Sequence, residues 1–424
     1  MCAVPAPART PSSYRLLTGG RVVIPEGVFS PGWIRLAGST IDAVGAGDAP
    51  EQRGLVATDL RGSWVLPGFV DMHVHGGGGA SFTEGPADDA RRAAGFHREH
   101  GSTTIVASLV TAPLADLEAR VAMLAGLAGE GVLAGIHLEG PFLSAARCGA
   151  QDPRHTAAPD VAAFERLHAA AAGHLRVITL APELPGAIGL IKAASRGGVT
   201  VAVGHTDATA DITAAAVDAG VTHATHLFNG MRPLHHREPG PVGALLDRPG
   251  VTCEVIADGV HLHDIAIRLA ARAAGPGRLV LITDAMAAAG MPDGSYRLGS
   301  RRVNVAGGVA RLAADDEPGT ADAGTAGAGT AGAIAGSTAT MATVIRHAIA
   351  AGLTVTEAAA AASTTPARVL GLRDHTGALR PGLAADLVVC DEEFRLRAVM
   401  RRGEWLTGNR RNPAGISSSR GPNQ

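Results

Sequence analysis

The sequence predicts an α/β fold, a (β/α)8 barrel of the TIM type with a small β-sandwich domain formed by both ends of the chain. Eight apolar, strand-like runs alternate with segments of helical length between residues 65 and 284. This alternation is typical of a parallel sheet, and eight strands are enough to close it. Shorter strand-like runs stand at both ends, among them RLLTGGRVVI and DLVVCDEEF. The 424 residues suffice for one barrel of about 250 residues and such a domain.

The eight predicted barrel strands are short runs rich in Val, Ile and Leu. They lie at residues 65–72, 103–110, 132–138, 175–181, 199–204, 221–226, 251–257 and 279–283. Most segments between them are amphipathic or Ala-rich over helical length, as in PADDARRAAGFHREH and ATADITAAAVDAG. The segment between the sixth and seventh strands is rich in Pro, His and Arg and is predicted to be a loop. Helices near 338–351 and 356–371 would complete the outer layer.

The same patterns divide the chain into parts. We expect residues 1–64 and 374–407 to form the two halves of the small β-domain, and residues 65–373 to form the barrel. A low-complexity Gly/Ala/Thr segment near 313–333 has little to bury and is predicted to be a surface insertion. The polar tail at 408–424 is predicted to be disordered.

Composition excludes several classes of partner. The formal net charge is −2 without long runs of one sign, so neither nucleic acid nor an anionic membrane is indicated, and a small molecule is the expected ligand. The four cysteines are scattered without a CxxC pair, which fits a reducing compartment. Because the sequence has neither a signal-peptide pattern nor an apolar run of about 18 residues, we expect a cytoplasmic protein.

Side chains of metal-ligand type stand at the ends of five predicted strands. They are His73, His75, Glu139, His205, His226 and Asp284. The carboxyl ends of barrel strands converge on one mouth, which is where such barrels carry their chemistry. His73 and His75 project to the same side of their strand because side chains alternate with period two. Imidazole and carboxylate donors suit Zn²⁺, Fe²⁺ or a similar divalent ion.

This set of residues indicates metal-dependent hydrolysis of an amide. A divalent ion lowers the pKa of bound water toward ~7 and polarises a carbonyl, and Asp284 could take the water proton and return it to the leaving amine. Any single histidine at a strand end is more often structural than a ligand, but coincidence at five strand ends favours a site. His137 and His223 lie inside strands and are expected to be buried structural residues, whereas His97 lies on a helical segment and is expected to face solvent.

Several motifs make the chain resemble the N-acetylglucosamine-6-phosphate deacetylases, a branch of the amidohydrolase superfamily. LPGFVDMHVH and GLAADLVV mark the superfamily, whereas HLEGPF and THLFNGM are typical of this branch. The resemblance extends from about residue 15 to about residue 405. It implies a homodimeric enzyme that hydrolyses N-acetyl-D-glucosamine 6-phosphate to D-glucosamine 6-phosphate and acetate, in amino sugar catabolism and cell-wall sugar recycling.

The resemblance also implies roles for individual residues. Glu139, His205 and His226 would hold the catalytic ion and Asp284 would be the acid and base, while His73 and His75 would allow a second ion bridged by Glu139, so that a subunit holds one or two ions. Arg237 would reach the phosphate in the neighbouring subunit's site. Substrate recognition is implied for Ala150, Gln151, Asn229, Gly230, Asp258, Gly259, Val260, His261, Ile334, Ala335 and Gly336.

One departure and three alternatives remain. Gln151 stands where the branch commonly has histidine, and an amide can donate a hydrogen bond but cannot protonate a substrate. A galacto substrate, N-acetylgalactosamine 6-phosphate, stays open. Cyclic-amide hydrolases that use a carboxylated lysine on the fourth strand are disfavoured, because Lys192 is the only lysine and lies beyond that strand. A non-catalytic relative is also disfavoured, because such proteins usually lose ligands and all six residues are present.

Overall fold

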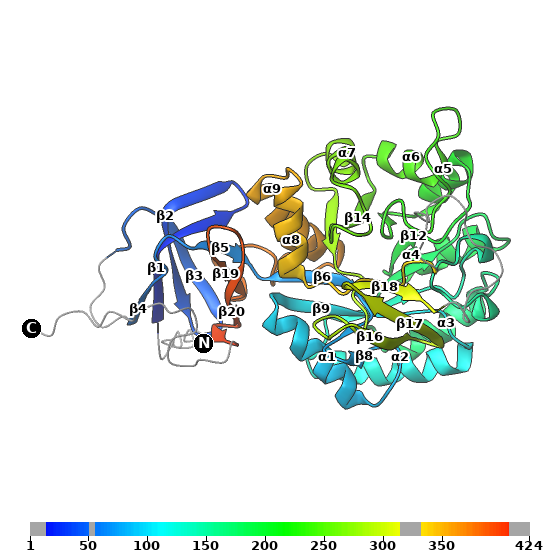
Figure 1. Cartoon of the computed structure of the whole chain (residues 1–424), viewed down its shortest axis with the longest axis horizontal. Coiled ribbons are helices and arrows are strands. Elements are labelled where there is room, and N and C mark those ends of the chain that lie inside the picture. The colour runs from blue at the N-terminus through cyan, green and yellow to red at the C-terminus, as the bar shows by residue number, and fades with distance from the viewer. Residues whose placement is uncertain (1–13, 51–55, 314–331, 407–424) are drawn as a thin grey trace, which may run out of the picture.

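A barrel of eight parallel strands forms the larger part of the protein, and the computed structural model describes residues 14–50, 56–313 and 332–406 (Figure 1). The predicted tail at 408–424 and nearly all of the predicted insertion at 313–333 lie outside these residues. The barrel strands are, in chain order, β6 (Phe69–Val74), β9 (Ser102–Leu109), β10 (Gly135–Glu139), β11 (Leu175–Leu180), β12 (Thr200–Val203), β13 (His223–Ala224), β14 (Thr252–Ile256) and β15 (Leu279–Ile282).

The barrel strands pair in chain order from β6 to β15. The two ends meet where the backbone N–H of Asp284 donates to the carbonyl of His73 at 2.9 Å. All eight predicted strands are present within a few residues of their predicted bounds. The run predicted as one strand at 65–72 is two strands, because β5 (Trp64–Pro67) pairs outside the barrel with β1 and β19.

Helices cover the outside of the barrel (Figure 1). Their amphipathic or Ala-rich sequences bury one face against the strands, as with Leu117, Val121 and Leu124 of α2. The helices are α1 (Ala87–Glu99), α2 (Leu114–Gly129), α3 (Val161–Ala170), α4 (Ala187–Arg196), α5 (Ala210–Ala219), α6 (Gly240–Asp247), α7 (Asp264–Ala274), α8 (Met341–Ala350), α9 (Val355–Ala359) and α10 (Thr365–Val369), with a π-helical turn, Ala360–Thr364, between the last two. Among the helices of the described residues, none is long and apolar enough to cross a bilayer.

As predicted, both ends of the chain build the small β-domain, and its strands are hydrogen-bonded into one sheet. The sheet order is β21-β20-β19-β5-β1-β2-β3, and β4 pairs in parallel with β1. Its apolar core includes Leu17, Ile34 and Leu387. The remaining strands of this sheet are β1 (Tyr14–Ile24), β2 (Gly27–Ala37), β3 (Thr40–Ala46), β4 (Val56–Asp59), β19 (Leu387–Cys390), β20 (Leu396–Arg401) and β21 (Glu404–Trp405).

A three-stranded antiparallel sheet follows the last barrel strand and packs near the barrel mouth. It consists of β16 (Gly294–Leu298), β17 (Arg301–Ala306) and β18 (Val309–Leu312), in that order. Its buried side chains share an apolar cluster with Val110, which directly follows β9, and with Met286, which lies four residues after the end of β15. The sheet therefore stands at the end of the barrel where the strands finish. A short hairpin, β7 (Gly76–Gly77) with β8 (Ala80–Ser81), follows β6.

The barrel interior is apolar at one end and polar at the other. Val177, Ala202, Ile256 and Val280 form an apolar cluster with Leu370 after α10. Near the carboxyl ends of the strands the interior carries buried polar side chains instead, namely Ser108, His137, Thr179, His223, Thr225 and Glu254. His137 and His223 are fully buried, as expected.

His97 corrects an expectation, because it is fully buried rather than solvent-facing. Its Nε2 lies 2.8 Å from the carbonyl oxygen of Gly76, which follows the HVH segment directly. A helical residue three turns into α1 thus contacts the residue that directly follows the candidate ligand His75.

Candidate metal centre

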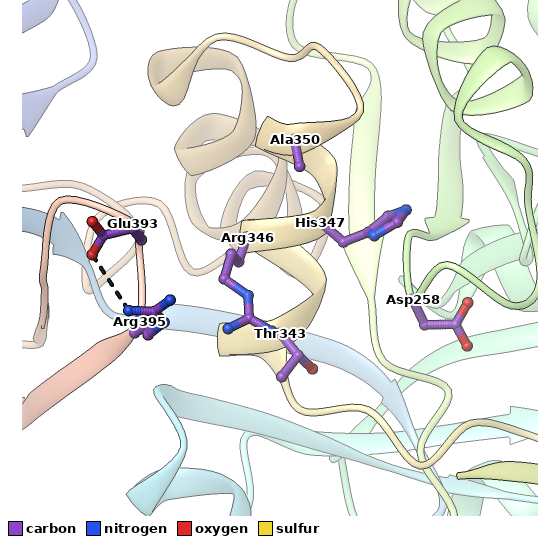
Figure 2. A pocket seen from close by; sticks show the side chains of 7 residues that line it. All are labelled: Asp258, Thr343, Arg346, His347, Ala350, Glu393 and Arg395. Carbon is purple, nitrogen blue, oxygen red and sulfur yellow. Dashed lines mark ion pairs between the residues drawn. The ribbon is translucent and has the colours of Figure 1, made fainter. Parts of the chain in front are cut away.

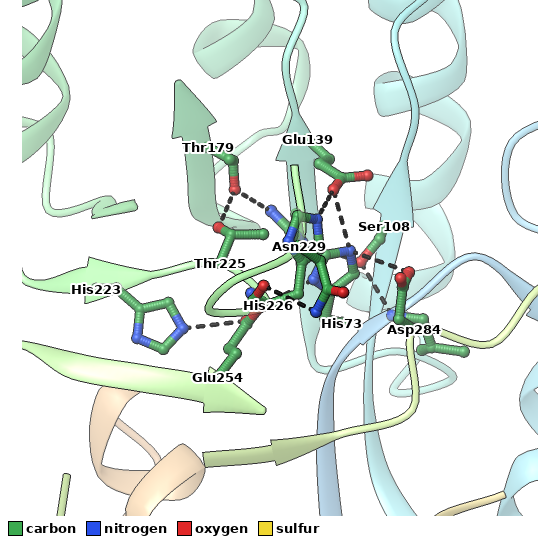
Figure 3. Close-up of polar contacts among 12 residues, drawn as sticks. His73, Ser108, Glu139, Thr179, His223, Thr225, His226, Asn229, Glu254 and Asp284 are labelled. Carbon is green, nitrogen blue, oxygen red and sulfur yellow. Dashed lines mark hydrogen bonds and ion pairs between the residues drawn. The ribbon is translucent and has the colours of Figure 1, made fainter. Parts of the chain in front are cut away.

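The six strand-end residues converge at the polar end of the barrel, and Figure 3 labels four of them, His73, Glu139, His226 and Asp284. His73 lies on β6 and Glu139 ends β10, whereas His205, His226 and Asp284 follow β12, β13 and β15. Five of them form two sets, His73–His75–Glu139 and Glu139–His205–His226, and in each set the possible ligand atoms lie within 4.8 Å of one another. Glu139 belongs to both sets and therefore stands between two possible ion positions.

The two oxygens of Glu139 face different rings, although His73 lies nearer to Oε1, with its Nε2 at 3.6 Å. Its Oε1 lies 2.8 Å from Nε2 of His226 and 3.0 Å from Nε2 of His205. Its Oε2 lies 3.3 Å from Nε2 of His75. The carboxylate is 3% exposed, so its charge is held among imidazoles rather than by water.

The far nitrogen of three rings faces a group that can only accept a hydrogen bond. Nδ1 of His205 lies 2.9 Å from the carbonyl oxygen of Arg147, and Nδ1 of His75 lies 3.1 Å from that of Ser108. Nδ1 of His73 lies 3.0 Å from Oε2 of Glu254. Each Nδ1 therefore carries the proton, and in the neutral ring Nε2 turns a lone pair toward the centre. Lone pairs that converge on a carboxylate repel one another unless a cation lies between them, so these donors fit a divalent ion.

Without an ion, the rings would hold protons instead. Burial lowers the pKa of His75, but hydrogen bonds to Asp284 and Glu139 outweigh it and raise this pKa to about 9. Burial acts in the same direction on His73, yet Glu254 and Glu139 raise its pKa well above the usual value. An incoming cation therefore replaces protons on these rings, as expected for a metal-binding cluster.

Asp284 stands beside the His73–His75 pair. Its Oδ1 lies 3.2 Å from Nε2 of His75 and 3.5 Å from Nε2 of His73, and 10% of its side chain is exposed. Burial raises the pKa of Asp284, but the His73 and His75 rings outweigh it and hold this pKa below the usual value. An ionised carboxylate in this place can accept a proton.

Three of the strand-end residues have left-handed backbone conformations. The φ angles are 47° at His205, 27° at His226 and 49° at Asp284. Positive φ is uncommon outside glycine and costs on the order of 1–3 kcal/mol per residue when the surroundings impose it. The turns after β12, β13 and β15 accept this strain, and each aims its side chain at the centre.

Glu254 is a site residue that the sequence analysis missed. It is fully buried on β14, and its Oε2 accepts from Nδ1 of His73 and from the backbone N–H of His226, both at 3.0 Å. Its Oε1 accepts from Nε2 of His223 at 3.0 Å (Figure 3). One carboxylate thus orients a candidate ligand from each set. A lone acid inside the apolar run VTCEVIA was the available signal.

Several residues with an implied substrate role line one cavity. Asp258, Val260, His261, Ile334 and Gly336 line a cavity of about 300 Å³. Oδ1 of Asp258 accepts from the backbone N–H of both Val260 and His261 at 2.9 Å, which fixes the loop that also contains Gly259. The following residue, Ser337, donates its backbone N–H to the carbonyl of Asp284 at 2.7 Å, so the segment that contains Ala335 lies beside Asp284.

Two glycines allow these loops to approach the centre. Gly230 has φ 59°, and a Cβ there would lie 2.8 Å from Nδ1 of His205. Gly336 has φ 65°, and a Cβ there would lie 2.9 Å from the carbonyl oxygen of Asp284. Any side chain would push the loop away from the candidate ligand. Asn229, next to Gly230, donates from Nδ2 to the carbonyl of His226 at 3.2 Å.

The other residues with an implied role lie apart from this cavity. Gln151 contacts Glu139 directly, with Nε2 donating to Oε2 at 2.6 Å, and Ala150 packs against the three-stranded sheet. Arg237 lies on the exposed loop before α6, where its backbone N–H donates to His235 and its Nη1 lies 2.7 Å from Nε2 of His236. The structure does not bring Arg237 to the metal-type cluster of its own chain.

A second cavity lies on the other side of Asp258 (Figure 2). It measures about 350 Å³ and opens between α8 and the connection from β19 to β20. Arg346 and His347 of α8 line it, with the Arg395–Glu393 ion pair of 3.5 Å on the opposite side. It shares Asp258 and Thr343 with the first cavity, but it lacks Ser337, the residue that joins the first cavity to Asp284.

Comparisons with known proteins agree with this geometry. The model of the amidohydrolase family matches residues 64–406. The chain is 35% identical over 394 residues to N-acetylgalactosamine-6-phosphate deacetylase of Escherichia coli O157:H7 (92% of this chain, 98% of the relative), and 37% identical over 373 residues to N-acetylglucosamine-6-phosphate deacetylase of Bos taurus (84% and 86%). A solved structure, a point mutant of N-acetyl-D-glucosamine-6-phosphate deacetylase from Mycobacterium smegmatis in complex with N-acetyl-D-glucosamine-6-phosphate, matches with a TM-score of 0.86 at 46% identity and covers 94% of this chain and all of that one. The chain therefore belongs to the amidohydrolase family.

Proposed function

We propose that this protein is a metal-dependent deacetylase that hydrolyses N-acetyl-D-glucosamine 6-phosphate to D-glucosamine 6-phosphate and acetate. The observation that carries the proposal is the cluster at the barrel mouth, where imidazole lone pairs converge on Glu139 beside the ionised Asp284. The relatives supply the substrate class, because those compared above are named deacetylases of N-acetyl amino sugar 6-phosphates.

Each residue of the cluster has a part in the proposed reaction. Glu139, His205 and His226 would hold a divalent ion such as Zn²⁺ or Fe²⁺, and His73 and His75 could hold a second one with Glu139. Such an ion, when bound, acidifies water and polarises the acetamide carbonyl. Asp284 takes the proton from the attacking water and then gives it to the nitrogen of the leaving amine.

The sugar would lie in the cavity next to Asp284. Asp258, His261 and the loop Ile334–Gly336 offer polar side chains and backbone groups there, and Asn229 and Gly230 border the His205 side. N-acetylgalactosamine 6-phosphate is the second candidate substrate, since one relative at 35% identity is named for it. The two sugars differ in the orientation of one hydroxyl, so the substrates must be compared directly.

We also propose that the enzyme works as a homodimer in the cytoplasm. Large apolar side chains are exposed on neighbouring elements around α6, with Leu234 54%, Ile265 53% and Leu269 58% exposed. Arg237 lies on the same exposed loop as Leu234, so a partner that covered Leu234 would lie close to Arg237. A guanidinium binds phosphate in a bidentate manner, which suits a contact with the partner's substrate.

Acetate release from N-acetyl-D-glucosamine 6-phosphate tests the proposal, with the galacto and unphosphorylated sugars as comparisons and the metal content measured on the same sample. The phosphorylated gluco sugar should be turned over fastest, and a chelator should abolish the reaction. The variant Asp284→Asn should keep its metal and lose about three orders of magnitude in kcat, since a proton acceptor is removed. No acetate from any of these sugars at full metal content would refute the proposed substrate.

A further inference from the structure

Gln151 is built into the cluster by two hydrogen bonds. Its Nε2 donates to Oε2 of Glu139 at 2.6 Å, and its Oε1 accepts from the backbone N–H of Thr111 at 2.7 Å. Because a backbone N–H can only donate, this second bond fixes the amide oxygen on the Thr111 side and the NH₂ group on the Glu139 side. The residue is 4% exposed, so water competes little for either contact.

The amide makes the two oxygens of Glu139 unequal. Oε1 faces the His205 and His226 rings at 3.0 and 2.8 Å, and Nε2 of His73 lies farther from it, at 3.6 Å. Oε2 faces His75 at 3.3 Å and is shared with Gln151. A donated hydrogen bond occupies a lone pair and draws negative charge from the oxygen that accepts it. Oε2 is consequently the poorer ligand for a cation.

The loop that carries Gln151 also holds His205. The carbonyl oxygen of Arg147 faces Nδ1 of His205 at 2.9 Å, and the backbone N–H of Ser144 donates to the carbonyl of His205 at 3.0 Å. His73 and His75 are instead oriented by barrel strands, through Glu254 of β14 and the carbonyl of Ser108 on β9. The loop therefore supports the Glu139–His205–His226 position.

We propose that Gln151 is a positioning residue that makes the two ion positions unequal. It holds Glu139 so that Oε1 serves the His205–His226 position, and it weakens the His73–His75 position by engaging Oε2. The inference rests on the proposed metal dependence, but it concerns ion binding and not turnover. Glutamine suits the task because its amide neither gains nor loses a proton, so Gln151 remains a donor whatever the pH.

Titration of the chelator-treated full chain with Co²⁺ tests the inference, followed by calorimetry and by the visible absorption of the ion. The wild-type protein should bind two ions in separate steps, the first at least about tenfold tighter. Gln151→Met fills the same space without a hydrogen-bond donor. It should reduce the ratio between the affinities of the first and second steps by about tenfold. Gln151→Glu retains an acceptor for Thr111 and adds a negative charge beside Oε2, so it should tighten the second step further.

Arg154→Ala is the matched control, since Arg154 lies in the same loop and donates to Asp152. It loosens the loop without removing the Gln151 amide, and its gap between the two steps should equal that of the wild type. Thermal unfolding of each chelator-treated variant establishes that it is folded, and the Glu variant provides the comparison if the Met variant does not fold.

The inference is overturned if both Gln151 variants bind Co²⁺ with the same step affinities as the wild type. It is also overturned if the wild type and both variants all bind in a single step. Acetate release on the same samples separates this result from the proposed function. Unequal steps that change with Gln151 but no acetate release would leave the inference standing and refute the function. Binding steps that do not change with Gln151, together with normal acetate release, would refute the inference and leave the proposed function standing.

Discussion

Glu254 joins the two candidate ion positions through one buried carboxylate. It accepts from His73 of one set and from the backbone of His226 in the other, and burial leaves it no water to exchange with. Burial raises the pKa of Glu254, but the His73 and His223 rings outweigh it and hold this pKa well below the usual value. The orientation of His73 therefore depends on the negative charge of Glu254, which is not itself one of the candidate ligands.

Glu254→Gln should weaken divalent ion binding by about 10- to 100-fold, because residues that orient metal ligands have effects of this size. The glutamine amide has one acceptor oxygen, whereas the Glu254 carboxylate accepts from three donors, on His73, His223 and His226. Competition against a chromophoric chelator measures the affinity. Glu357→Gln removes a carboxylate from the helix cap of α9 and serves as control. If the two variants bound the divalent ion equally well, Glu254 would have no role in ion binding and would serve only the packing of the barrel.

His97 gives the folded protein a predictable sensitivity to acid. Burial lowers the pKa of His97 to about 4, against 6.5 for an exposed histidine. The unfolded chain thus binds a proton more readily than the folded one between these values. The stability that depends on neutral His97 is complete above pH 6.5 and is lost as the pH falls toward 4, by roughly 3 kcal/mol.

His97→Gln should flatten this dependence, because a side-chain amide can still donate to Gly76 but does not titrate in this range. Urea unfolding at pH 7 and at pH 4.5 measures the difference in free energy of unfolding. His168→Gln, on the surface of α3, is the control. If the His97 variant lost as much stability on acidification as the wild type, another group would be responsible.

The loop from Ser144 to His155 is the element that connects the cluster to the three-stranded sheet. Asp152 accepts from the backbone and guanidinium of Arg154 and from Oγ of Ser300, the latter at 2.6 Å. Hydrogen bonds to Arg154 and Ser300 outweigh the effect of burial and lower the pKa of Asp152, so this anchor stays charged. Ser300 lies in the turn between β16 and β17 and fastens the loop from outside.

Ser300→Ala should release the loop locally. Loss of one hydrogen bond to a charged acceptor costs about 1–2 kcal/mol, so amide hydrogen exchange in residues 144–152 should accelerate about five- to thirtyfold. Exchange followed by mass spectrometry measures this. Ser295→Ala, on the exposed side of β16, is the control and should leave exchange unchanged. Unaltered exchange in the Ser300 variant would mean that Ala150 and Gln151 hold the loop alone.

Sequence patterns predicted the elements better than the contacts between them. The strands and the convergence of the six strand-end side chains follow from alternation and from the rule that barrel strands end at one mouth. His97 could not be placed, because its burial depends on Gly76 lying above α1. Gln151 was expected to face substrate, and its contact with Glu139 depends on the path of a loop that no local pattern encodes.

The exposed apolar face around α6 is a property of the whole molecule. Ile265 and Leu269 lie one turn apart on α7, and Leu234 packs near α6. Several large apolar side chains close together on a surface usually mark an interface. If the proposed homodimer forms through this face, a charge in its middle should prevent it.

Leu269→Lys should sediment as a monomer at concentrations where the wild type is a dimer, since burying an unpaired charge is costly. It should also raise KM for the phosphorylated sugar, as should Arg237→Ala in the intact dimer. Val28→Glu is the control, because it places a charge at an exposed apolar residue of the β-domain, away from α6 and α7. Sedimentation velocity and acetate release provide the two readouts, and a dimeric Leu269 variant would place the interface elsewhere.

The sheet of the small domain has a consequence for how the protein is made. In this sheet β5 lies between β1 and β19. β1 is synthesised early, whereas β19 comes about 320 residues after β5 in the chain. At typical elongation rates the nascent N-terminal strands wait on the order of tens of seconds for that neighbour. During this interval the edge of β5 is unpaired, and the barrel can fold before the domain that precedes it in the chain. The small domain can therefore complete its sheet only after β19 has been synthesised, although most of its strands are synthesised before the barrel.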